Sequence, residues 1–181
     1  DASGTSTSAS ESLQGGNGDD WMVSNSSNEN FDGGAGGYDL VDFQNDLVGP
    51  VTVNLATGTG SGFGADTLMN VEAVQGTEFD DHLTGDNGVN YFFGWIGSDT
   101  IAGAGGNDEI DAGIGYYDQT FTYQPTGDTD NVDGGVGSDT CINANAPEIN
   151  NCETKTTTSN EITPHPLTQT AEDSETFRRS F

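Results

Sequence analysis

The stretch 94–111, GWIGSDTIA followed at once by GAGGNDEID, holds two consecutive copies of one nine-residue pattern. Each copy begins with a glycine-containing turn, has aspartate at the sixth position (Asp99, Asp108) and an apolar residue at the eighth (Ile101, Ile110). Three further copies occupy residues 15–23, 34–42 and 134–142. This recurrence predicts one short structural unit repeated along the chain.

The residue types within the nonad predict a turn, a cation ligand and a buried side chain. Glycine has no side chain, so it turns tightly and lets backbone carbonyls crowd around an ion. Calcium prefers six to eight oxygens from carboxylates and carbonyls, and the sixth-position aspartate supplies the carboxylate. The three residues after the turn form a short strand whose eighth-position residue points inward. Nine residues fill this inward position: Met22, Phe31, Val41, Leu83, Phe92, Ile101, Ile110, Val132 and Cys141.

The pattern resembles the RTX (repeats-in-toxin) calcium-binding nonapeptide, GGxGxDxUx, over roughly residues 15–142. The resemblance implies an all-β fold, a parallel β-roll (a β-solenoid) in which two nonads complete one coil and several calcium ions lie between stacked turns. The side-chain ligands it implies are Asp20, Asp39, Asp81, Asn90, Asp99, Asp108 and Asp139. The carbonyl ligands it implies are those of Gly16, Gly18, Gly37, Gly97, Gly106 and Gly137. The alternative fold is an antiparallel sandwich with Gly-Asp turns.

Two nonads per coil would stack each turn on the turn that lies two nonads further along the chain. This spacing pairs Asp81 with Asp99, and Asn90 with Asp108, although an asparagine weakens its site. The separation of Asp20 and Asp39 exceeds two nonads by a single residue, and Gly33 would absorb this insertion.

The chain divides into three parts. Residues 1–14 form a Ser/Thr-rich N-terminal segment, and the roll occupies 15–142 with interruptions at 43–75 and 112–124. In the first interruption, alternation over 50–55 predicts a half-buried strand, and 71–74 a second one. Residues 24–32 read as a degenerate nonad with Glu29 sixth and Phe31 eighth. Residues 143–181 form a cysteine-containing end and a Thr/Pro-containing tail, which we expect to be flexible or to act as an assembly arm.

Cys141 and Cys152 are the only cysteines and would close a short loop. Because the chain has an extracellular character, we expect a disulfide that caps the end of the roll. The alternative is two free buried thiols.

The charge of the chain excludes several partners. Thirty acidic residues against three basic ones give a formal charge of −27, and hydrophobic residues make up 31%. No basic surface exists to bind nucleic acid or an anionic membrane, and no apolar run approaches the ~20 residues of a membrane-spanning helix. Low hydrophobicity and high charge predict a chain that is disordered without metal and folded with it.

Catalysis is not expected. His82 and His165 lack the partners of a catalytic triad or a zinc site, and the pairs Asp19-Asp20 and Asp80-Asp81 are better explained as calcium ligands with solvated neighbours. The aromatic residues suggest either a glycan-binding or assembly surface, or local packing over an insertion; they are Trp21, Trp95, Tyr116, Tyr117, Phe121 and Tyr123.

We therefore expect a secreted, non-enzymatic calcium-binding β-roll, which the resemblance implies is bacterial. One hypothesis is a structural subunit of an extracellular filament, layer or adhesive matrix, bound to itself or to other surface proteins. The alternative is a calcium-dependent folding and export module of a larger secreted RTX protein. The start at Asp1, which suggests a mature product or a fragment, and the cysteine pair favour the first hypothesis.

Overall fold

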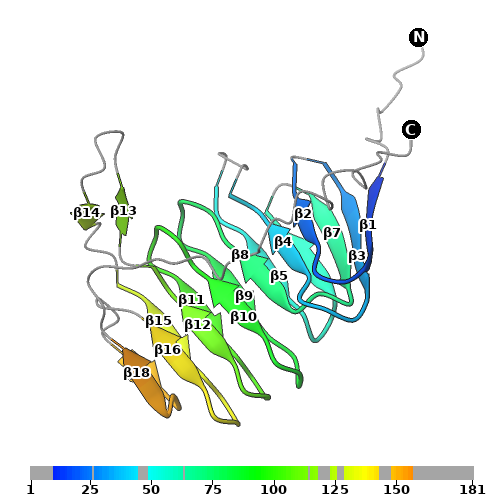
Figure 1. The fold of residues 1–181 in the computed structure, drawn as a ribbon. Coiled ribbons are helices and arrows are strands. Elements are labelled where there is room, and N and C mark those ends of the chain that lie inside the picture. The colour runs from blue at the N-terminus through cyan, green and yellow to red at the C-terminus, as the bar shows by residue number, and fades with distance from the viewer. Residues whose placement is uncertain are drawn as a thin grey trace.

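The computed structural model describes residues 10–25, 27–44, 49–62, 64–113, 115–117, 123–125, 129–142 and 148–156. These residues form short strands that wind into a roll with two main sheets (Figure 1). Apart from two local antiparallel segments, neighbouring strands run parallel. The parallel β-roll expected from the sequence is thereby confirmed, and the antiparallel sandwich is wrong.

The first sheet contains nine strands, in the spatial order β1 (Glu11–Asn17), β3 (Glu29–Ala35), β7 (Ala65–Met69), β6 (Thr59–Ser61), β5 (Thr52–Asn54), β9 (His82–Thr84), β11 (Thr100–Ala102), β15 (Asn131–Asp133) and β17 (Glu148–Asn150). The second contains seven, in the order β18 (Thr154–Thr156), β16 (Thr140–Ile142), β12 (Glu109–Asp111), β10 (Tyr91–Phe93), β8 (Ala73–Gln75), β4 (Leu40–Asp42) and β2 (Trp21–Val23). A separate antiparallel pair, β13 (Gly115–Tyr117) and β14 (Tyr123–Pro125), lies in the second interruption.

Within the repeats, successive strands alternate between the sheets, so two nonads complete one coil. Ile101 pairs with Leu83, and Ile110 with Phe92, so the partners in each pair are two nonads apart. All nine residues predicted to point inward are buried and form a single apolar cluster between the sheets. Each strand of a nonad contributes one such side chain, so the core is narrow.

Residues 43–75 widen the first sheet. β7 pairs in parallel with β3, β6 runs antiparallel between β7 and β5, and β5 joins β9 in parallel. In the second sheet β8 follows β4 directly. The predicted strands at 50–55 and 71–74 are confirmed as β5 and β8. β6 and β7 were not predicted.

Two boundaries differ from the sequence-based expectation. β1 begins at Glu11, so residues 11–14 belong to the first coil, where Leu13 pairs with Phe31. The inserted residue between Asp20 and Asp39 is not Gly33. Paired residues of β1 and β3 are two nonads apart as far as Asn17 and Ala35. In the next pair of strands, β2 and β4, the separation is one residue larger, so the insertion lies between these two points. Gly37 lies against Gly18, which leaves Gly36 as the inserted residue.

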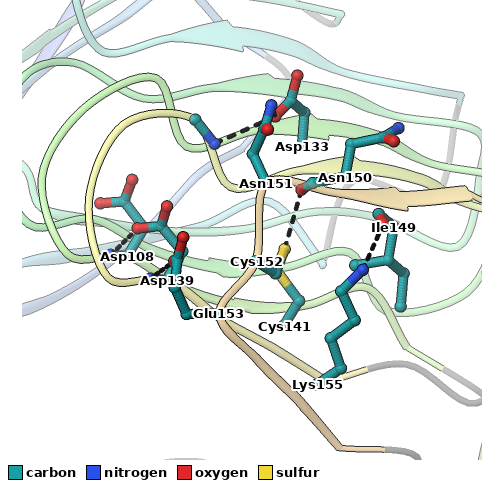
Figure 2. The surroundings of a disulfide bond; sticks show 11 residues. Asp108, Asp133, Asp139, Cys141, Ile149, Asn150, Asn151, Cys152, Glu153 and Lys155 are labelled. Carbon is teal, nitrogen blue, oxygen red and sulfur yellow. Dashed lines mark hydrogen bonds between the residues drawn. A yellow bond between two sulfur atoms is a disulfide. The ribbon is translucent and has the colours of Figure 1, made fainter.

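The predicted disulfide is present between Cys141 and Cys152, whose Cα atoms are 5.9 Å apart (Figure 2). The alternative of two free thiols is therefore wrong. The predictions for residues 1–9, for His165 and the rest of the tail beyond 156, and for Phe121 fall outside the described residues, as do the side chains of Tyr116, Tyr117 and Tyr123. Among the described residues there is no helix with the length and hydropathy of a membrane span.

Candidate metal centre

The sixth-position side chains stack along the two edges of the roll, one above another. The first column comprises the turns that lead from the first sheet to the second and contains Asp20, Asp39, Glu72, Asn90, Asp108, Asp139 and Glu153. The second column comprises the turns that lead from the second sheet to the first and contains Asp81, Asp99 and Asp130. In the N-terminal coils, Glu29 and Asp66 stack in the same way.

Within each column, a side chain accepts a hydrogen bond from the backbone N–H of its equivalent one coil earlier. The N–H of Asp81 donates to Oδ1 of Asp99 at 2.8 Å, and the N–H of Asp99 donates to Oδ1 of Asp130 at 2.9 Å. The first column repeats this bond from Asn90 to Asp108 at 2.8 Å and from Asp108 to Asp139 at 2.9 Å. One oxygen of each carboxylate thus fixes its orientation, and the other is directed into the turn.

In the turns of Asp99, Asp108 and Asp139, this second oxygen is buried without a hydrogen-bond partner. These oxygens are Oδ2 of Asp99, Asp108 and Asp139, whose side chains are 1%, 2% and 0% exposed. Burial raises the pKa of Asp99 to about 8 and that of Asp108 to about 6, because a charged carboxylate is poorly solvated there and has acidic neighbours. No lysine or arginine precedes Lys155 in the sequence, so these turns have no basic side chain of their own to balance the charge. A buried carboxylate in this position requires a cation or a proton.

The glycine at the first position of the nonad makes room for these oxygens. A Cβ on Gly94 would meet Oδ2 of Asp99 and would lie 2.6 Å from the carbonyl oxygen of Ala112 in the next coil. A Cβ on Gly103 would likewise meet Oδ2 of Asp108 and the carbonyl oxygen of Gly134. In each turn a carboxylate oxygen and a carbonyl oxygen from adjacent coils therefore converge where a side chain is missing. These are the two ligand types that calcium prefers.

Carbonyls of the predicted set also stack from coil to coil. The carbonyl of Gly18 lies against Gly37, and the carbonyl of Gly106 lies against Gly137. Gly16 lies in the same way against Gly34, while Gly97 lies against the carbonyl of Phe79, which was not predicted. A side chain at the second residue of each pair would collide with the carbonyl, which explains why glycine is used there.

A family model for the RTX calcium-binding nonapeptide repeat matches residues 5–40, 72–101 and 96–116 in four copies. These residues of the chain are RTX calcium-binding nonapeptide repeats. RTX repeats bind calcium and are usually found in secreted proteins, and the disulfide is consistent with an extracellular location. A comparison with curated proteins found no match.

The RTX turns of this chain differ in how well they suit an ion. Asp81 has both oxygens engaged by protein donors: the N–H of Val51 at 2.8 Å, and the N–H and hydroxyl of Thr77 at 2.6 and 3.0 Å. The side-chain oxygen of Asn90 accepts a bond from the N–H of Asp86 at 2.9 Å. The structure thus stacks the predicted pairs Asp81–Asp99 and Asn90–Asp108, but the better fit to calcium lies with Asp99, Asp108 and Asp139.

Several members of the columns were not predicted as ligands. Asp130 occupies the sixth place before Val132, so the nonad pattern could have identified it. Glu72 and Glu153 follow turns without the glycine pattern, and only the fold reveals their place. His82, by contrast, is exposed on the outer face of β9, as its seventh position predicted. Trp21 is 48% exposed, and its indole N–H donates to Asp42 at 3.1 Å.

Across the described ranges, no three His, Cys, Asp or Glu side chains form a metal-binding group. An ion in an RTX turn of this chain would therefore combine one or two carboxylates with backbone carbonyls. This matches the mixed oxygen ligands of calcium better than the nitrogen and sulfur ligands of zinc.

Proposed function

We propose that this protein is a secreted, non-enzymatic β-roll that folds when it binds calcium and serves as a structural subunit of an extracellular filament, layer or adhesive matrix. The observation that carries the calcium part is the set of buried, unpartnered Oδ2 atoms of Asp99, Asp108 and Asp139. Each ion would lie between the turns of neighbouring coils, held by these carboxylates together with turn carbonyls such as those of Gly106 and Gly134. Asp20, Asp39 and the carbonyls of Gly16, Gly18, Gly37, Gly97 and Gly137 are the corresponding candidates in the other turns.

Calcium would supply stability that the core alone does not. Each nonad buries one inward side chain, whereas every ordered residue loses conformational entropy on folding. The carboxylates of a column also repel one another unless a cation lies between them. A ligand that binds the folded state alone shifts the equilibrium toward that state by mass action. Extracellular calcium sites commonly have dissociation constants of about 10⁻⁴–10⁻³ M, so folding would follow export.

Circular dichroism and calorimetry test this proposal. At neutral pH or above, the purified chain is expected to show a disordered spectrum in EDTA and a β spectrum after excess calcium, with several ions bound per chain. Magnesium at the same concentration serves as the control, because it requires a tighter octahedral site. A β spectrum that is the same in EDTA and in calcium, with no heat of calcium binding, would refute the proposal.

The structural role is favoured by the disulfide, which fixes the last described coil as a cap would. The second candidate function, a folding and export module, has the same calcium chemistry. Electron microscopy in calcium discriminates between them: fibres or sheets support the structural subunit, and monodisperse particles support the module.

A further inference from the structure

The last coil of the roll is built differently from the others. Only three residues, Asn151, Cys152 and Glu153, connect β17 to β18, whereas an intact nonad has a six-residue turn. Asn151 has a left-handed φ of 49°, which takes the place of a turn glycine. The strands nevertheless keep the register of the roll, since Ile149 pairs with Val132 and Lys155 pairs with Cys141.

Glu153 occupies the next place in the first column. Its Oε2 accepts a hydrogen bond from the N–H of Asp139 at 2.7 Å. This is the same bond that Asp139 accepts from the N–H of Asp108 at 2.9 Å. Figure 2 shows the three carboxylates following one another beside the disulfide. Within the residues that the structure describes, the column therefore ends on a glutamate that belongs to no nonad.

A carboxylate oxygen and a carbonyl oxygen converge at this end of the column. Asp139 is 0% exposed, and its Oδ2 has no hydrogen-bond partner. A Cβ built on Gly134 would lie 2.9 Å from this oxygen and would also meet the carbonyl oxygen of Asn151. The space that Gly134 leaves open is thus bordered by a carboxylate and a carbonyl, and Glu153 follows two residues after that carbonyl.

The disulfide anchors the short turn that carries Glu153. Cys152 directly precedes it and is bonded to Cys141 at the inward position of β16. On either side of Cys152, the amide of Asn151 donates to Asp133 at 2.7 Å, and Nζ of Lys155 donates to the carbonyl of Ile149 at 2.7 Å. A long, exposed glutamate side chain would otherwise lose considerable rotamer freedom on binding an ion, and a fixed backbone reduces that loss.

We propose that Glu153, Asp139 and the carbonyl of Asn151 bind a terminal calcium ion, and that the Cys141–Cys152 disulfide positions Glu153 for it. The site rests on the proposed calcium function, but Glu153 and the half-cystine Cys152 that precedes it lie outside the nonads. The last coil would thus be closed both covalently and by an ion, at the end of the stack where fraying would begin.

The first test compares Glu153→Gln with the matched variant Glu78→Gln, by calorimetric calcium titration of the full chain. Glu78 is exposed in a second-column turn, so its substitution makes the same charge change away from Glu153. Glu153→Gln is expected to lose one ion from the stoichiometry, or to bind it at least about tenfold more weakly, while Glu78→Gln matches wild type. Equal stoichiometry and affinity in wild type and Glu153→Gln would overturn the proposal. If wild type itself binds no calcium, it is the proposed function that fails.

The second test removes the disulfide with the double variant Cys141→Ser/Cys152→Ser. Hydrogen exchange in calcium is expected to accelerate in residues 148–156 and to remain slow in β9–β12, and the terminal ion is expected to bind more weakly. This readout does not depend on whether Glu153→Gln folds. If the double variant binds all ions as tightly as wild type, the disulfide does not position Glu153 and that part of the proposal is overturned.

Discussion

The sixth-position aspartates act through two separate oxygens. In Asp99, Asp108 and Asp139, one oxygen accepts a backbone N–H from the preceding coil, and the other is buried without a partner. A substitution that preserves the shape of the aspartate side chain but removes its charge separates the coil-to-coil hydrogen bond from the binding of an ion. Asparagine can still accept the backbone bond through Oδ1, but it presents an amide in place of the anionic oxygen.

Asp108→Asn is therefore expected to weaken calcium-dependent folding and leave the coil-to-coil bond intact. Loss of one ion present at a hundred times its dissociation constant removes about 2.7 kcal/mol of stability. The midpoint of a calcium titration followed by circular dichroism should move to higher calcium concentration. An unchanged midpoint would mean that Asp108 is not a ligand.

Thr77→Val provides the control, because it affects Asp81, a column residue whose oxygens are already bound by protein donors. It removes the hydroxyl that binds Asp81 at 3.0 Å and retains the side-chain volume. Stability in calcium is expected to fall by about 1–3 kcal/mol, because a buried carboxylate loses a donor. The number of calcium ions bound should not change.

At the scale of elements, the nine-residue period predicted those strands and turns whose structure is determined within a single nonad. A nonad fixes its own turn, strand and inward side chain, so the nine inward residues could be identified from their spacing. β6 contains Thr59, Gly60 and Ser61 and has no apolar alternation, and its place is fixed by pairing with β5 and β7. Of the donors to Asp81, Thr77 lies in the same nonad, whereas Val51 is distant in the sequence and its bond was not visible in a nine-residue window.

The turn glycines also differ in whether a local or a coil-to-coil requirement explains them. Gly36 and Gly37 form a matched pair for testing this difference. Both have positive φ, at 70° and 116°, but a Cβ on Gly36 would meet open space, whereas one on Gly37 would collide with the carbonyl of Gly18. Gly36→Ala is expected to cost about 1–2 kcal/mol for the left-handed conformation alone. Gly37→Ala should cost clearly more, because two coils must move apart. Thermal unfolding of both variants in calcium measures the difference, and equal melting temperatures would contradict the stacked arrangement of these turns.

At the scale of the whole molecule, stability depends on how the acidic charge is neutralised. Protons and calcium compete for the same buried oxygens. The chain has only three basic residues that could also neutralise the acidic charge. The folded state raises the pKa of Asp99 from 3.8 to about 8, and burial also raises the pKa values of Asp39 and Asp108 to about 6. A group whose pKa is raised on folding stabilises the fold when protonated, and that contribution disappears as the pH rises through the folded-state pKa.

In EDTA, the roll is therefore expected to be most stable near pH 4 and to lose stability progressively up to about pH 8. In calcium the dependence should reverse, because binding requires the deprotonated carboxylates and releases protons. The β content measured by circular dichroism from pH 4 to 8 in EDTA and in calcium would reveal two curves of opposite slope, with the effect of calcium largest at high pH. Parallel curves would show that these carboxylates do not exchange protons for calcium, and the columns would then be a structural feature of the roll without being its cation sites.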